Sequence, residues 1–176
     1  MNHLEQVGKD FQDWLSRIAE GTEPFPQQDV DPILRMAHNA GDHPIVGLIL
    51  LALAQGLPTH RVTELSSFVR PTKNGIHAAQ AMLILACAAP QGEVETVMPG
   101  LREALAQLRT VDFIGQAENP HIGRAIQAHL LALEALTGGD FSATGPTATV
   151  AHILLSENAK VTGSKRASDA ATLVKD

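Results

Sequence analysis

The sequence contains few of the residues that sheets, disulfides and nucleic-acid contacts require. Aromatic residues make up 3% of the chain, with five Phe, one Trp and no Tyr, so residues that favour strands are scarce. The single cysteine, Cys87, excludes an internal disulfide. Charged residues make up 18%, and the formal net charge is −6. Because neutralising a phosphate backbone needs a basic stripe, we do not expect nucleic acid as a partner.

Long apolar runs are also absent. No uninterrupted stretch of about 18 apolar residues occurs, so we expect no membrane span. The first residues, MNHLEQVGKDFQDWL, are amphipathic and acidic-polar, which does not resemble a secretory signal. With one cysteine and no export signal, the sequence predicts a cytoplasmic protein.

What the sequence does contain is Ala and Leu, the strongest helix formers, in segments separated by Gly and Pro. These segments predict an all-α fold of about eight helices. We expect a single helical domain over residues 1–160, in which 1–21 form an amphipathic capping helix, followed by a tail over 161–176. Within the tail, Ser168 and Asp169 are a possible cap for one short helix. The predicted helices span 3–20, 32–39, 43–55, 59–69, 76–89, 93–108, 120–136 and 148–159.

Two of these segments resemble each other at a separation of 34 residues. HPIVGLILLALAQG, which begins at His43, is repeated as HAAQAMLILACAAP, which begins at His77. Stacked helical hairpins have repeat lengths in this range. The spacing therefore predicts repeat-like antiparallel α-hairpins, arranged as a tetratricopeptide-like array or as a closed helical bundle. The Trp, Tyr and Gly landmarks of the tetratricopeptide repeat are absent. Because both segments are apolar around the helix, we expect Leu51→Asp or Leu85→Asp to unfold the chain.

One apolar stripe is a candidate binding surface. Phe11, Trp14 and Ile18 recur at helical spacing in the first predicted helix, in the manner of helices that dock into a groove. The alternative is that the stripe packs within the chain and closes the end of the hairpin array.

A group of polar residues near the first repeat is a candidate metal or acid–base site. His38 and Asp42 are four residues apart, and His43 follows directly. The alternative is that Asp42 caps the next helix and that His43 lies in its first, solvated turn. The sequence contains no GxSxG, CxxC or HExxH motif and no phosphate-binding loop with its lysine.

These patterns favour a non-catalytic protein–protein interaction module: a cytoplasmic adaptor, assembly subunit or chaperone-like protein without a cofactor. It would hold a segment of another protein, or of a second copy of itself, on a helical surface. The alternative is a small metal-binding protein or enzyme that uses His38, Asp42 and His43, and it predicts bound transition metal that a His43→Ala variant loses. A third hypothesis is a regulatory domain with a ligand pocket between hairpins. Eight histidines also suggest that partner affinity changes between about pH 6 and 7.

Overall fold

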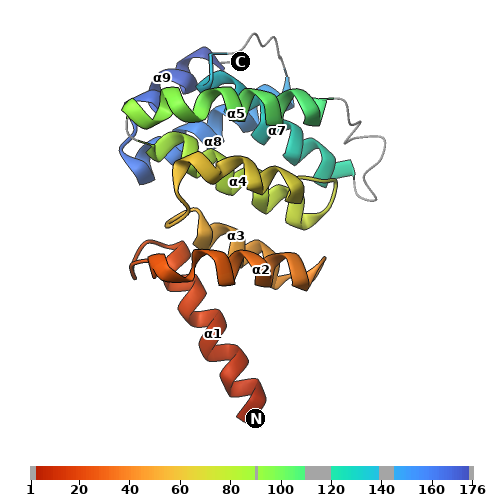
Figure 1. The fold of residues 1–176 in the computed structure, drawn as a ribbon. Helices are drawn as coiled ribbons and strands as arrows, with labels where there is room; N and C mark the ends of the chain where they lie inside the picture. Colours follow the sequence, from red (N-terminus) through yellow and green to blue (C-terminus); the bar gives the residue numbers. More distant parts are fainter. Residues whose placement is uncertain (1–2, 90, 110–119, 139–144, 175–176) are drawn as a thin grey trace. The chain divides into compact units, whose positions relative to one another are not determined.

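The computed structural model describes residues 3–89, 91–109, 120–138 and 145–174, and these residues form an all-α protein (Figure 1). Eight α-helices and two 3₁₀ segments occur in these ranges, with no strand among them. The prediction of an all-α fold with about eight helices is therefore confirmed. The packing divides the chain into two compact units, unit 1 (Met1–Leu57) and unit 2 (Pro58–Asp176), whereas the sequence predicted one domain over 1–160.

Unit 1 is built around a short apolar helix. Helix α3 (Ile45–Leu53) packs against both α1 (His3–Ala19) and α2 (Val30–Ala40), and the 3₁₀ turn η1 (Gln27–Asp29) leads into α2. Two helices flank α3, which explains why it is apolar on nearly every face. The core of this unit comprises Leu15, Ile18, Ile33, Leu34, Val46, Ile49, Leu50 and Leu53.

Unit 2 is built around α4 (Lys73–Ala88) and α7 (Pro120–Leu136), which pack against each other. Helix α4 also contacts the 3₁₀ segment η2 (Thr59–Phe68) and α8 (Pro146–Thr162), and α7 also contacts α8, α9 (Lys165–Leu173) and α5 (Gln91–Arg109). A helix with neighbours on several sides must be apolar on several sides. The two repeated segments, in α3 and α4, are therefore apolar for the same reason, because each helix is covered on several sides. The two helices nevertheless belong to different units.

The segment after the first repeated helix differs from the prediction. Residues 59–68 form a 3₁₀ helix, not the α-helix expected over 59–69. The hydroxyl of Ser66 donates to the carbonyl oxygen of Thr63, three residues earlier (2.7 Å). The hydroxyl of Ser67 donates in the same way to the carbonyl oxygen of Glu64 (3.1 Å). Such local side-chain bonds compete with the α-helical ladder, and 3₁₀ runs longer than three or four residues are uncommon.

Helix α9 (Lys165–Leu173) belongs to unit 2 and lies within the predicted tail. Helix α9 starts earlier than the possible cap at Ser168 and Asp169, because the hydroxyl of Ser164 accepts from the backbone N–H of Ala167 (3.2 Å). Ala167, Ala170, Ala171 and Val174 are buried. Residues predicted as a tail therefore contribute to the core of this unit.

In the ranges that the structure describes, no helix combines the length and the apolar character that crossing a membrane requires. The helix predicted over 120–136 is α7, and the residues before it, 110–119, lie outside the described residues.

Candidate functional site

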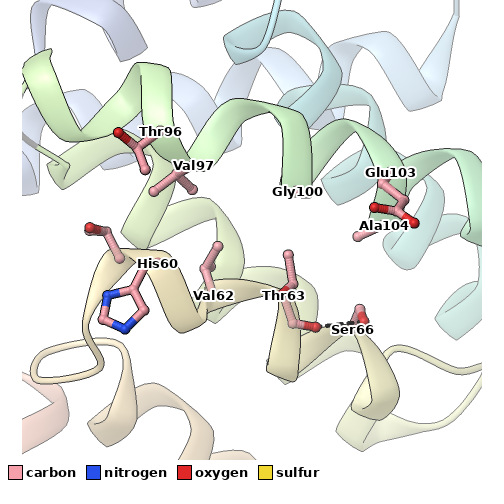
Figure 2. A pocket seen from close by; sticks show the side chains of 10 residues that line it. His60, Val62, Thr63, Ser66, Thr96, Val97, Gly100, Glu103 and Ala104 are labelled. Carbon is pink, nitrogen blue, oxygen red and sulfur yellow. Dashed lines mark hydrogen bonds between the residues drawn. The ribbon is translucent and has the colours of Figure 1, made fainter.

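A groove of about 410 Å³ lies between η2 and α5 in unit 2. Figure 2 shows side chains of α5 facing those of η2 across it. Val62 and Val97 are buried and form its floor, whereas His60, Thr96 and Glu103 are exposed at its rim. The remaining lining residues are Thr59, Thr63, Ser66, Gly100 and Ala104. The groove is therefore rich in hydroxyl groups above an apolar floor.

Gly100 allows the two walls of the groove to approach each other. A Cβ atom at this position would lie 2.7 Å from Cγ2 of Thr63, closer than real contacts of this kind. Pro99 precedes it inside α5, and the helix nevertheless continues from Gln91 to Arg109. A proline inside a helix commonly bends or breaks it, but Pro99 does not end α5, and the small residue after it allows the contact with η2.

One end of the groove is held by a hydrogen bond between its two walls. The hydroxyl of Thr59 donates to the Glu93 carboxylate at the start of α5 (3.1 Å). Thr59 is the first residue of η2, and its hydroxyl bonds to α5 and does not cap its own helix. Beside it in η2, Arg61 and Glu64 form a bidentate ion pair of 2.6 and 3.1 Å, which aligns two side chains of this wall.

The predicted binding stripe on α1 is only partly exposed. Ile18 is fully buried in unit 1, whereas Phe11 and Trp14 are half-buried. The rings of Phe11 and Trp14 contact each other, with centroids 5.7 Å apart and planes tilted by 35°. The structure therefore separates the stripe into a core residue and an aromatic pair that retains some exposed surface.

The predicted metal group spans the last turn of α2, which holds His38, and the connection to α3, which holds Asp42 and His43. His38, Asp42 and His43 are all exposed, and Gly41 turns the chain between them with φ of 60°. Nδ1 of His43 accepts a hydrogen bond from the backbone N–H of Ile45 (3.1 Å), in the manner of a helix cap. Among the described residues, no group of three or more His, Cys, Asp or Glu side chains is arranged to hold a metal ion. A metal bound to Nδ1 of His43 would displace this hydrogen bond. A metal or acid–base role for His38, Asp42 and His43 stays a prediction.

Cys87 and the histidines of the apolar helices lie inside unit 2. Burial raises the pKa of the Cys87 thiol to about 12, although the nearby Arg166 opposes the shift, so the thiol is protonated at neutral pH. His129 is buried and its Nδ1 bonds to the carbonyl oxygen of Ala125 (2.8 Å). His152 bonds through Nδ1 to the carbonyl oxygen of Ala171 near the end of α9 (2.6 Å).

Sequence reasoning missed two arginines that satisfy the carbonyl groups at helix ends. Arg166 on α9 donates from Nη1 to the carbonyl oxygen of Ala86 and from Nη2 to that of Ala89 (3.2 Å), at the end of α4. Arg102 on α5 donates to the carbonyl oxygen of Thr137, just after α7. The last carbonyls of a helix have no partner within the helix and carry partial negative charge, so a guanidinium there both pairs and neutralises them. No local sequence pattern marks these contacts, because Arg166 lies 80 residues from Ala86.

We expect Arg166→Met to release α9 from unit 2. Hydrogen bonds from charged groups contribute about 1.5–3 kcal/mol, so the free energy of unfolding should fall by about 2 kcal/mol. Hydrogen exchange should show the amides of α9 losing protection before those of α4 and α7. Lys165→Met is the matched control, because Lys165 is exposed and adjacent. Equal protection of α9 in both variants would contradict this role.

Two further hollows border α9. One, of about 490 Å³, is lined by Lys160, Lys165 and serines of α8 and α9, and the other, of about 420 Å³, by Lys165, Arg166 and residues at the end of α7. Together they hold three basic residues that lie close in sequence, Lys160, Lys165 and Arg166. Arg166 is already engaged with α4, and Lys160 lies 3.7 Å from Glu157.

The chain was compared with protein-family models, with curated proteins and with solved structures, and no significant match was found in any of the three.

Proposed function

We propose that this protein is a non-catalytic protein–protein interaction module, an adaptor, assembly subunit or chaperone-like protein, and that the groove between η2 and α5 holds a segment of its partner. The observation that carries the proposal is the composition of the groove. Hydroxyl groups of Thr59, Thr63, Ser66 and Thr96 line it above the apolar floor of Val62 and Val97.

A polypeptide segment suits such a groove for a chemical reason. A hydroxyl group has one donor and two acceptor sites, so the hydroxyls of Thr63 and Thr96 can pair with either the N–H or the C=O of a partner's main chain. Those of Thr59 and Ser66 already donate to Glu93 and to the Thr63 carbonyl, so they can accept from a partner's N–H. The floor can take up one or two apolar side chains of the same segment. At the rim, the Glu103 carboxylate is an acceptor for a Lys or Arg of the partner. The volume of about 410 Å³ lies at the lower end of the range of ligand sites, which is roughly 300–1,000 Å³.

We expect Thr96→Arg to weaken partner binding at least tenfold without unfolding the protein. Thr96 is exposed on α5, so a long side chain is tolerated there but projects over the groove. Displacing the centre of an interface commonly costs about 1–2 kcal/mol or more, and about 1.4 kcal/mol corresponds to tenfold in affinity. The measurement is the Kd of the partner recovered with the protein from its native cells, by calorimetry.

Thr172→Arg is the matched control, because it is the same substitution at an exposed position on α9. It should leave the Kd unchanged. Equal loss in both variants, or in neither, would contradict the proposal for the groove. Trp14 is the only tryptophan and reports separately on α1. A change in its emission on binding that persists in Thr96→Arg would assign the partner to the Phe11 and Trp14 surface instead.

A further inference from the structure

Two histidines lie on α4 and α7, the helices that pack against each other in unit 2, and His77 is half-buried whereas His129 is buried. His129 on α7 is 6% exposed, and His77 on α4 has a ring nitrogen, Nδ1, that is buried without a hydrogen-bond partner. The two rings are close enough that the charge of His77 acts on His129. Buried polar atoms normally have hydrogen-bond partners. The free-energy cost of burying Nδ1 of His77 without a partner depends on whether this nitrogen carries a proton.

The neutral form of His77 suits this environment better than the charged form. In addition to the buried Nδ1, the ring forms a side-chain hydrogen bond with Gln80. Neutral imidazole can use one nitrogen for Gln80 and leave Nδ1 as an unprotonated lone pair. Imidazolium has an N–H on both nitrogens, and the N–H on Nδ1 would be buried with no acceptor. Protonation therefore adds an unsatisfied donor and a positive charge to the helix interface.

The charged groups that act on the two rings oppose their protonation. Lys73, one turn before His77 on α4, opposes the protonation of His77, and His77 opposes the protonation of His129. On the elements packed around α4 and α7, the charged groups whose contacts the structure defines are engaged elsewhere. Two ion pairs lie within single elements: Arg61 with Glu64 in η2, and Glu157 with Lys160 in α8. Arg102 and Arg166 bond to carbonyl groups at helix ends, and His152 bonds to the carbonyl of Ala171. Glu103 lines the groove.

We propose that His77 and His129 form a proton-sensitive contact that keeps α4 and α7 packed at neutral pH and opens unit 2 when either ring is protonated. The direction follows from the two protonation states. Burial is the largest cause that lowers the pKa of both rings below the usual 6.5, so the unfolded chain binds more protons than the folded chain in mild acid. The stabilisation from the neutral rings is therefore complete above about pH 6.5 and is lost as the pH falls below it.

Hydrogen exchange in α4 and α7 of the full chain tests this contact. Between pH 7.5 and 5.5, after correction for the intrinsic exchange rate, the opening equilibrium constant should rise by up to about tenfold for each ring. In His77→Gln and in His129→Gln, the opening equilibrium constant should rise up to about tenfold less than in the wild-type protein, because glutamine does not titrate. His121→Gln, at an exposed position on α7, is the control and should keep the wild-type dependence. The same pH dependence in all four proteins would overturn the proposal.

A titration of the wild-type protein covers the case in which a variant does not fold. The Cε1–H resonances of the histidines report protonation directly, and resonances of unfolded chain report opening. We expect two rings to take up protons at a lower pH than an ordinary histidine for as long as unit 2 stays folded, and to become protonated together with its opening. Ordinary titration of every histidine near pH 6.5, with α4 and α7 still protected, would overturn the proposal.

Discussion

Replacing Gly75 with alanine is expected to destabilise unit 2 by about 3 kcal/mol. In most helices the same substitution stabilises the helix by about 0.5–1 kcal/mol. Gly75 lies in the first turn of α4, where its N–H bonds to the hydroxyl of Thr72 (3.3 Å). The backbone of Arg70 packs directly on its Cα. A Cβ atom would overlap the carbonyl oxygen of Arg70 and lie 2.6 Å from its nitrogen. The obstacle is backbone, so the turn at residues 70–72 or the start of α4 must move.

Urea unfolding of the full chain, followed by circular dichroism, measures this effect. Gly100→Ala is the matched control, because its Cβ would meet only the Cγ2 methyl of Thr63, at 2.7 Å. A side-chain methyl can shift more easily than a carbonyl, so we expect a loss of about 1 kcal/mol there. A stabilised Gly75→Ala protein would show that the first turn of α4 is not held against Arg70.

Leu85→Asp is expected to unfold unit 2. Leu85 is 6% exposed on α4, which packs against η2, α7 and α8. A carboxylate buried there without a partner costs several kcal/mol, which is on the order of the stability of a whole domain. Loss of the helical circular dichroism of unit 2, or its absence from the soluble fraction, is the expected observation.

Ile84→Asp provides the comparison, since Ile84 is adjacent on the same helix and half-buried. Its carboxylate can reach water, so we expect no more than about half the destabilisation. The sequence predicts that Leu51→Asp and Leu85→Asp each unfold the chain, but Leu51 is only half-buried in α3. Leu51→Asp should therefore behave like Ile84→Asp. Unfolding by Ile84→Asp as complete as by Leu85→Asp would mean that α4 is enclosed on all sides.

Helix boundaries could be predicted where the stop and start signals are local. Gly21 follows α1, and Pro120 begins α7. The predicted end of the last helix at 159 falls short of Thr162, where Gly163 ends α8 with φ of 67°. The exception is η2, where apolar periodicity suggested an α-helix and Ser66 and Ser67 support a 3₁₀ helix through their own backbone bonds. Periodicity does not distinguish these two helices well over ten residues, because their repeats differ by only 0.6 residue per turn.

The candidate sites were harder to predict than the helices. Ile18 has the same spacing as Phe11 and Trp14, but α3 covers it and leaves the aromatic pair partly exposed. His43 was noted as a possible ligand, and its ring accepts from the N–H of Ile45. The groove between η2 and α5 has no sequence motif, since hydroxyl residues in each segment are individually typical of solvated surfaces.

The sequence by itself determined that this chain is helical and where most helices begin and end. Helix propensity, Gly and Pro act over a few neighbouring residues, so they can be read without knowing the fold. Only the tertiary structure decided which polar groups bond to each other, as Arg166 does to the end of α4 and Thr59 to Glu93, and that the charge of His77 acts on His129. These pairs are separated by 34 to 80 residues along the chain, and their energies depend on which helices become neighbours and how much water they exclude.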